Sequence, residues 1–252
     1  MEKISARLDT NDKNFITAFL PINFKAGNPI VIVCGGWESP AGQKNPFMFD
    51  DIGVVVFDYF GCGKTGGDPA LVTHKRYKSN LEDVFDWVCE QKWSQGSKIG
   101  TYGVSAGTVC SLRFAQDFNR SSFAILTASC NTAFVGMPNS PAKVLAENLS
   151  VLANGGTASM FGVERKAEYF TDFVGNSALY SIDKTNCPVL ILQGKKDNIW
   201  RQGDAYICYL ALKKAEKQVK HIEFEDGDHG LGTVARERDE AIYLWLKEIG
   251  IV

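Results

Sequence analysis

The chain has 252 residues, 45% hydrophobic and 22% charged, which is ordinary for a globular α/β protein with a large core. Its net charge of −2 argues against partners such as nucleic acid or an anionic membrane surface. No apolar run approaches the roughly 20 residues that a membrane span needs, and the N-terminus lacks the apolar core of a signal peptide. Seven cysteines without paired spacing fit reduced thiols, so we expect a cytoplasmic protein.

Short β-branched runs alternate with helical patterns along the chain, which predicts a mostly parallel sheet with helices on both faces. Two opening strands, near residues 4–8 and 15–19, are expected to form an antiparallel edge. Further strands are predicted at residues 29–33, 54–58, 98–102, 124–128, 188–194 and 221–225, and helices at 77–91, 108–118, 203–217 and 234–249. No internal repeat or low-complexity linker interrupts this pattern, so one domain is expected over residues 1–252.

A glycine-rich segment at residues 61–66 matches G-x-G-x-x-G and resembles the end of a phosphate-binding P-loop. Both kinds of nucleotide site need a helix to begin here and to present its N-terminal amides to phosphate. Residues 66–69, Gly-Gly-Asp-Pro, break helices instead, and Asp58 stands where a P-loop needs glycine. Nucleotide binding is therefore disfavoured.

Residues 103–107 read Gly-Val-Ser-Ala-Gly between a predicted strand and a predicted helix. Glycines at both ends let the strand and the helix approach closely where a side chain would clash. In this setting the G-x-S-x-G pattern predicts a nucleophile elbow, a tight turn that lifts the Ser105 hydroxyl above the sheet. An ordinary strand-to-helix turn is the alternative interpretation.

Residues 131–186 form a connection far longer than usual. The sequence predicts one amphipathic helix between Ser140 and Gly156, with leucines on one face. A second predicted helix carries Phe170 and ends near Gly175. These apolar side chains could simply pack the insertion onto the rest of the protein.

A serine nucleophile needs an imidazole to take its proton, and the imidazole needs a carboxylate to orient it. Asp197 lies in the turn after the predicted strand 188–194, and His229 lies in the loop after strand 221–225. Both lie at carboxyl ends of strands, where active-site loops gather in open α/β sheets. We therefore predict a triad of Ser105, Asp197 and His229.

The competing residues are few. His74 lies in a predicted early loop and His221 opens a strand that runs away from the site. Asp226 and Asp228 are so close in sequence to His229 that they are poorly placed to reach its far ring nitrogen. They are interpreted as solvated loop carboxylates.

These features resemble the α/β-hydrolase superfamily, in its esterase, thioesterase and serine-aminopeptidase-like branch, over nearly the whole chain. Residues 34–37, Cys-Gly-Gly-Trp, resemble the family's His-Gly oxyanion loop, with Cys34 in place of histidine. Residues 58–65 resemble its Asp-x-x-Gly-x-Gly-x-Ser loop, with Cys62 and Thr65 as departures.

The resemblance implies the α/β-hydrolase fold, with residues 131–186 as a helical cap over the active site. It also implies that an oxyanion is bound by the backbone N–H of Ala106 and that of Gly36 or Trp37. An apolar or aromatic cap implies an apolar acyl or alcohol group on the substrate. The residues expected to line the substrate pocket are Trp37, Trp200, Phe161, Phe170 and Leu231.

The implied activity is that of a serine hydrolase, without metal or other cofactor, that cleaves a small-molecule carboxylic ester or thioester through an acyl-enzyme. The same triad also serves amide, peptide and carbon–carbon hydrolysis and acyl transfer, so these alternatives stay open. A ligand receptor that has kept the fold and triad is a further alternative. Dehalogenases and epoxide hydrolases are disfavoured, because they carry aspartate where Ser105 stands. The sequence leaves the oligomeric state open.

Overall fold

The computed structural model describes residues 1–36, 44–117, 120–131, 141–160, 162–175, 177–200 and 202–252. Within these ranges, eight strands form one sheet in the order β1-β2-β4-β3-β5-β6-β9-β10. The pairs β1–β2 and β2–β4 are antiparallel, as predicted for the opening strands, and the other pairs are parallel. The strands are β1 (Glu2–Arg7), β2 (Phe15–Leu20), β3 (Ile30–Cys34), β4 (Gly53–Phe57), β5 (Ile99–Val104), β6 (Ala124–Thr127), β9 (Val189–Gly194) and β10 (Val219–Phe224).

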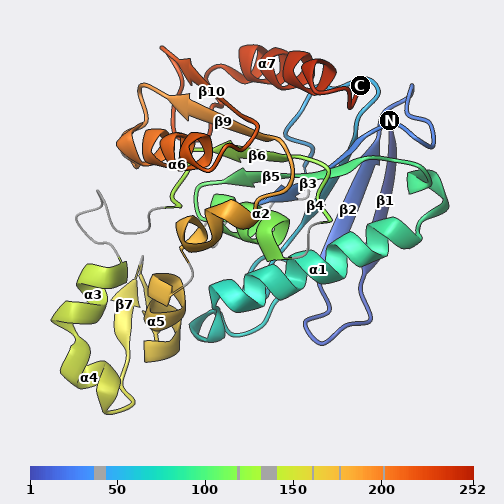
Figure 1. The fold of residues 1–252 in the computed structure, drawn as a ribbon. Helices are drawn as coiled ribbons and strands as arrows, with labels where there is room; N and C mark the ends of the chain where they lie inside the picture. The colour runs from blue at the N-terminus through green and yellow to red at the C-terminus, as the bar shows by residue number, and fades with distance from the viewer. Residues whose placement is uncertain (37–43, 118–119, 132–140, 161, 176, 201) are drawn as a thin grey trace.

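Helices cover both faces of the sheet, which gives the three layers seen in Figure 1. Side chains alternate across each strand, so Val189 and Ile191 pack towards α2 and α6 while Leu190 and Leu192 pack towards α7. Burial on both faces explains why the first four residues of β9, Val-Leu-Ile-Leu, are all apolar. The helices of this core are α1 (His74–Glu90), α2 (Gly107–Asp117), α6 (Gln202–Lys214) and α7 (Ala235–Glu248), with short 3₁₀ turns η1 (Pro69–Leu71) and η2 (Lys92–Ser94).

Helix α1 begins one turn earlier than predicted. Thr73 caps it, because its hydroxyl accepts a hydrogen bond from the Arg76 N–H at 3.1 Å. His74, predicted to lie in a loop, is therefore the first residue of the helix. The prediction missed this cap because apolar periodicity starts only at Tyr77.

The glycine-rich segment after β4 folds as a closed turn. A bridge joins Cys62 to Gly66, and Gly61 and Gly63 both have positive φ. The Asp58 carboxylate accepts the Lys64 N–H at 2.9 Å across this turn. No helix begins among these described residues, so the segment lacks the helix N-terminus that binds phosphate.

In the insertion between β6 and β9, the described residues 141–160 and 162–175 form a small subassembly beside α1 and away from α7 (Figure 1), while residues 178–184 pack against α2 and α6. The single helix predicted after Ser140 is instead two short helices that break at Asn148, and Leu149 is 60% exposed. The side chain of Asn148 donates to the Val144 carbonyl at 2.9 Å, a local bond that competes with helix continuation. The elements are α3 (Pro141–Glu147), α4 (Leu149–Ala153), β7 (Ala158–Met160), β8 (Val163–Arg165), α5 (Ala167–Gly175) and η3 (Ala178–Lys184).

Candidate active site

Ser105 lies in a strained turn between β5 and α2. Its φ is +52°, a region that residues with a side chain rarely adopt. The Ser105 N–H donates to the Thr127 carbonyl at 2.9 Å. The Ser105 carbonyl accepts from the Thr108 N–H at 2.9 Å, from the Thr108 hydroxyl at 2.6 Å and from the Cys130 thiol at 2.9 Å. These bonds hold the serine in a conformation that it would not adopt alone.

The glycines on either side of Ser105 are required by close approach of the backbone. A Cβ at Gly103 would lie 2.6 Å from the Gly107 carbonyl oxygen. A Cβ at Gly107 would overlap the carbonyl oxygen of Cys34, at the end of β3. The elbow therefore fits directly against the loop that follows β3.

The predicted oxyanion donors are partly described. A Cβ at Gly36 would lie 3.4 Å from Ser105 Cβ and 4.0 Å from Ser105 Oγ, so the loop after β3 passes beside the serine. Ala106 is buried, and its N–H has no acceptor within the described ranges. Trp37 lies outside the described residues. Two of the three expected N–H donors thus belong to residues next to the Ser105 side chain.

Asp197 and His229 lie together at the ends of the parallel neighbours β9 and β10. The distance from His229 Nδ1 to Asp197 Oδ2 is 2.9 Å. Their loops touch, because a Cβ at Gly194 would overlap the Gly227 carbonyl oxygen. The Asp197 side chain is fully buried and that of His229 is 17% exposed.

The Asp197 carboxylate is held in its ionised form. One oxygen accepts the backbone N–H groups of Ile199 at 2.9 Å and Trp200 at 2.8 Å, and the other also accepts Gln193 Nε2 at 3.2 Å. Burial raises the pKa of Asp197, but the hydrogen bonds with His229, Trp200 and Ile199 outweigh it and hold the pKa below 3.8. An ionised Asp197 favours the tautomer that carries its proton on Nδ1, which leaves Nε2 able to accept one.

Asp226 and Asp228, the alternative acids, contact groups other than His229. Asp228 accepts the Gly232 N–H at 2.6 Å within its own loop. Asp226 forms an exposed ion pair with Lys196 at 2.6 Å. Of the three carboxylates, the structure places Asp197 against the imidazole of His229.

Ser105 belongs to the same sheet edge as this pair. β5, β6, β9 and β10 are consecutive parallel strands, so their carboxyl ends lie along one edge. Trp200, in the loop of Asp197, shares a buried cluster with Ala106, and so links that loop to the elbow. In the part of the chain that the structure describes, no hydrogen bond joins Ser105 Oγ to His229. Such bonds are often long in enzymes without substrate.

The described residues among those predicted to line the substrate pocket lie in different parts of the structure. Trp200 is 4% exposed and packs in the cluster beside the elbow. Leu231 is fully buried in the core under α7. Phe170 is also fully buried and packs edge-on against Tyr169, with ring centroids 5.1 Å apart. Phe161 lies outside the described residues.

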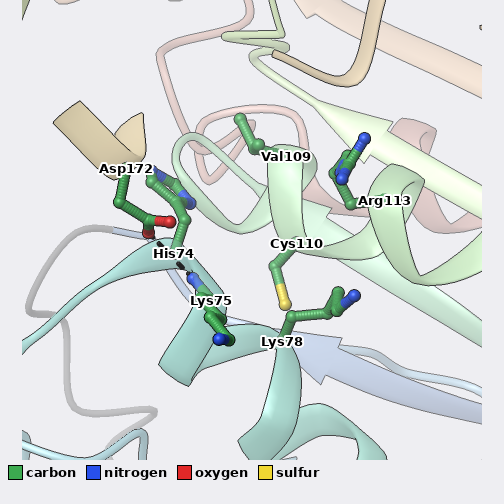
Figure 2. Close-up of a pocket in the computed structure, with 7 residues that line it drawn as sticks. All are labelled: His74, Lys75, Lys78, Val109, Cys110, Arg113 and Asp172. Carbon is green, nitrogen blue, oxygen red and sulfur yellow. Dashed lines mark hydrogen bonds between the residues drawn. The ribbon is translucent and has the colours of Figure 1, made fainter. Parts of the chain in front are cut away.

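A pocket of about 190 Å³ lies where α1, α2 and α5 meet (Figure 2). Four of its seven lining residues are charged, and none of the described residues expected to line the substrate pocket is among them. Sequence patterns did not indicate it, since its three helices are far apart along the chain and come together only in the fold. Its lining residues are His74, Lys75, Lys78, Val109, Cys110, Arg113 and Asp172.

Burial disfavours the thiolate form of several cysteines. All seven are free thiols. Burial raises the pKa of Cys130, and it raises the pKa of Cys187 to about 12. Among the described residues, no three His, Cys, Asp or Glu side chains gather as metal ligands. No helix in those ranges has the length and apolarity to cross a bilayer.

Three solved structures with a similar fold have ester-related names. Est1E from Butyrivibrio proteoclasticus, with ferulic acid bound, is 15% identical (TM-score 0.73) and covers 97% of this chain and 98% of its own. A monoacylglycerol lipase from Paleococcus ferrophilus is 17% identical (TM-score 0.72; 92% and 98%). A highly thermostable carboxyl esterase from Bacillus coagulans, in complex with glycerol, is 14% identical (TM-score 0.70; 100% of both chains).

At these identities the structures show the shared α/β-hydrolase fold and no more. No protein of curated function matches the sequence. The model of the prolyl oligopeptidase family matches residues 43–250, which is most of the chain. The chain therefore belongs to the prolyl oligopeptidase family of serine hydrolases, within the α/β-hydrolase superfamily.

Proposed function

We propose that the protein hydrolyses carboxylic esters, with Ser105 as nucleophile, His229 as general base and Asp197 as the residue that orients His229. One observation carries this proposal. Ser105 is held at φ +52° beside Gly36, at the same sheet edge as the Asp197–His229 pair. Holding a serine in this conformation costs free energy, on the order of 1–3 kcal/mol, that an ordinary turn has no reason to carry.

In the proposed mechanism, Ser105 Oγ attacks the ester carbonyl and its proton passes to His229 Nε2. The negative oxygen of the tetrahedral intermediate accepts the N–H of Ala106 and that of Gly36 or Trp37. His229 then gives the proton to the leaving alcohol, and the acyl group stays on Ser105. Water, activated by the same imidazole, releases the acid.

Oxygen or sulfur esters of small molecules are the proposed substrates. The names of the three similar structures, which include a monoacylglycerol lipase and a carboxyl esterase, support this class. We also propose that residues 131–186 cover Ser105, because α5 packs on α1 and closes one side of the pocket next to α2. Buried aromatic residues such as Phe170 then shape that cover from within.

Peptide-bond hydrolysis is the second candidate, and the family match favours it. A panel of 4-nitrophenyl esters, matching thioesters and peptide 4-nitroanilides separates the two. We expect the esters to be cleaved with the highest kcat/KM. Faster cleavage of the anilides would replace the proposed function with that of a peptidase.

The panel is run on the wild type, on Ser105→Ala and on Ser150→Ala. Ser150 is exposed on the insertion and serves as the matched control. Loss of a triad nucleophile lowers kcat by about 10⁶, so ester cleavage by Ser105→Ala is expected to fall to background while Ser150→Ala keeps full activity. Wild-type turnover by Ser105→Ala would refute the mechanism.

A further inference from the structure

A buried glutamine of β9, Gln193, contacts the carboxylate of Asp197. Its side chain is fully buried, and because side chains alternate across a strand, it lies on the same face of the sheet as Ile191, which α6 covers. Its amide nitrogen, Nε2, lies 3.2 Å from Asp197 Oδ2 and 3.0 Å from the Gly194 carbonyl oxygen. Both of these oxygens are acceptors, so the N–H₂ end of the amide faces them.

Gln193 holds the carboxylate oxygen that faces the imidazole. Asp197 Oδ2 lies 2.9 Å from His229 Nδ1, whereas Oδ1 accepts the backbone N–H groups of Ile199 and Trp200 in its own loop. Among the described residues, Gln193 is the one group besides His229 that hydrogen-bonds Oδ2. Because β9 is paired with β6 on one side and β10 on the other, the sheet fixes the position of this donor.

A fixed donor to Oδ2 matters because the other partner of that oxygen changes during the reaction. His229 gains and loses a proton in each half of the proposed mechanism, so its hydrogen bond with Asp197 changes in strength. The terminal torsion of an aspartate side chain is soft, so the carboxylate can turn about its Cβ–Cγ bond. The hydrogen bond from Gln193 restrains this rotation and keeps Oδ2 directed at Nδ1.

Stability does not account for this glutamine. The Gly194 carbonyl also accepts the Asp197 N–H at 3.3 Å, and Asp197 Oδ2 also pairs with His229, so both acceptors keep a partner without Gln193. Gln193 Oε1 is buried, and no group in the described part of the protein donates to it. Since a buried acceptor without a donor costs free energy, an apolar side chain of the same length would suit this position at least as well.

We propose that Gln193 is a positioning residue for the triad, whose amide N–H keeps Asp197 Oδ2 in line with His229 Nδ1 and so speeds the activation of Ser105. The proposal rests on the mechanism proposed above. Because Gln193 is fully buried, it acts on the rate of the reaction through Asp197 and leaves substrate binding unchanged.

Gln193→Met tests this role in the hydrolysis of a 4-nitrophenyl ester. The variant keeps the length of the side chain and loses the donor, so kcat is expected to fall about tenfold while KM stays within about twofold. The free energy of unfolding in urea is expected to stay at or above the wild-type value, because no acceptor loses its last partner. An unchanged kcat would overturn the role of Gln193.

Gln116→Met is the matched control. Gln116 is also a buried glutamine, and its Nε2 donates to the Ala178 carbonyl at 2.8 Å and to Thr185 Oγ1 at 3.2 Å. As with Gln193, no group in the described ranges donates to its Oε1. Its contacts do not involve the triad, so the control is expected to keep the wild-type kcat. Equal losses of kcat in the two variants would contradict a specific role for Gln193.

Combination with Asp197→Asn separates positioning from general damage to the site. If Gln193 acts through the Asp197 carboxylate, adding Gln193→Met to Asp197→Asn lowers kcat by less than about a further twofold. Losses that multiply would overturn the proposed role. Gln193→Leu removes the same donor with a different side-chain shape, and it takes the place of Gln193→Met in these comparisons if that variant does not fold.

The rate at which a fluorophosphonate probe labels Ser105 separates this inference from ester hydrolysis itself. The probe reports activation of the serine without any substrate, and we expect labelling of Gln193→Met to be about tenfold slower than that of the wild type. This result without ester cleavage by the wild type would support Gln193 and contradict only the proposed substrate class. Equal labelling rates would overturn the role of Gln193 alone, and a wild type that is not labelled would contradict both proposals.

Discussion

The carboxylate of Asp197 is the most constrained polar group at the candidate site. It is fully buried and accepts hydrogen bonds from His229, Gln193 and two backbone N–H groups. Because its pKa lies below 3.8, the residue stays ionised at every pH at which a neutral imidazole acts as base. Its proposed role is therefore orientation and charge stabilisation, and proton transfer is left to His229.

Asp197→Asn tests that role. The amide keeps the shape of the side chain but favours the wrong imidazole tautomer, so kcat is expected to fall by about 10³–10⁴ with little change in KM. The measurement is steady-state hydrolysis of a 4-nitrophenyl ester. Asp226→Asn, at the exposed partner of Lys196, is the control and should stay within about twofold. A larger loss in the control would mean that Asp226 is the acid.

Gly103→Ala tests whether the elbow depends on close backbone approach. The new Cβ would lie 2.6 Å from the Gly107 carbonyl oxygen, so the backbone has to move. We expect the free energy of unfolding in urea to fall by about 2 kcal/mol or more. Gly203→Ala is the matched control, because a Cβ there meets nothing within 4 Å and alanine favours helix α6. Equal stability of the two variants would contradict a tight elbow.

At the scale of elements, helices α1 and α5 meet at a half-buried histidine, His74. The His74 ring lies 4.4 Å from the Phe173 ring, and burial lowers the pKa of His74 from 6.5 to about 4. Between these pH values the unfolded chain binds more protons, so stability falls as pH drops from 6.5 towards 4. The shift corresponds to roughly 3 kcal/mol.

His74→Phe is expected to remove this acid sensitivity. The free energy of unfolding of the wild type should fall between pH 6.5 and 4 by more than that of the variant, measured by urea titration at each pH. Well above pH 6.5 His74 is neutral in both the folded and the unfolded chain, so it adds no pH dependence to stability there. Identical pH profiles for the two proteins would show that His74 is not buried as a neutral imidazole.

The start of α6 supports the candidate site through Trp200. Its backbone N–H binds Asp197, its indole packs with Ala106, and its indole N–H donates to Asp204, which is 1% exposed. Trp200→Phe keeps the first contact but leaves the Asp204 carboxylate without that donor. We expect a loss of about 1–3 kcal/mol in stability and a lower kcat. Tyr206→Phe, at an exposed position of α6, is the control in urea unfolding and esterase assays. If Trp200→Phe and Tyr206→Phe had the same stability and the same kcat, the role of Trp200 would be contradicted.

At the scale of the whole molecule, the sheet could be predicted because its strands carry their own signals. β9 is buried on both faces, and its first four residues are therefore all apolar. The elbow could also be predicted from the sequence, because the close approach of its strand and helix admits only small residues at Gly103 and Gly107. Both patterns are formed by residues that are close together in the sequence.

Features that depend on distant segments were not predictable in the same way. The hairpin of β7 and β8 has strands of three residues, too short to show a period of two. The helix after Ser140 was expected to continue through Asn148, whose side chain instead donates to the Val144 carbonyl. The charged pocket joins His74, Arg113 and Asp172 from three helices, so no window of sequence contains it.

Mapping the adduct of a fluorophosphonate probe by peptide mass spectrometry tests the central claim most directly, that Ser105 is an activated nucleophile. An unactivated serine hydroxyl barely reacts with such probes, whereas one paired with a general base reacts rapidly. We predict a single adduct on the peptide that contains Ser105, formed fast in the wild type and much more slowly in His229→Ala. Folded wild-type protein that stays unlabelled, or that carries the adduct on another residue, would contradict the account.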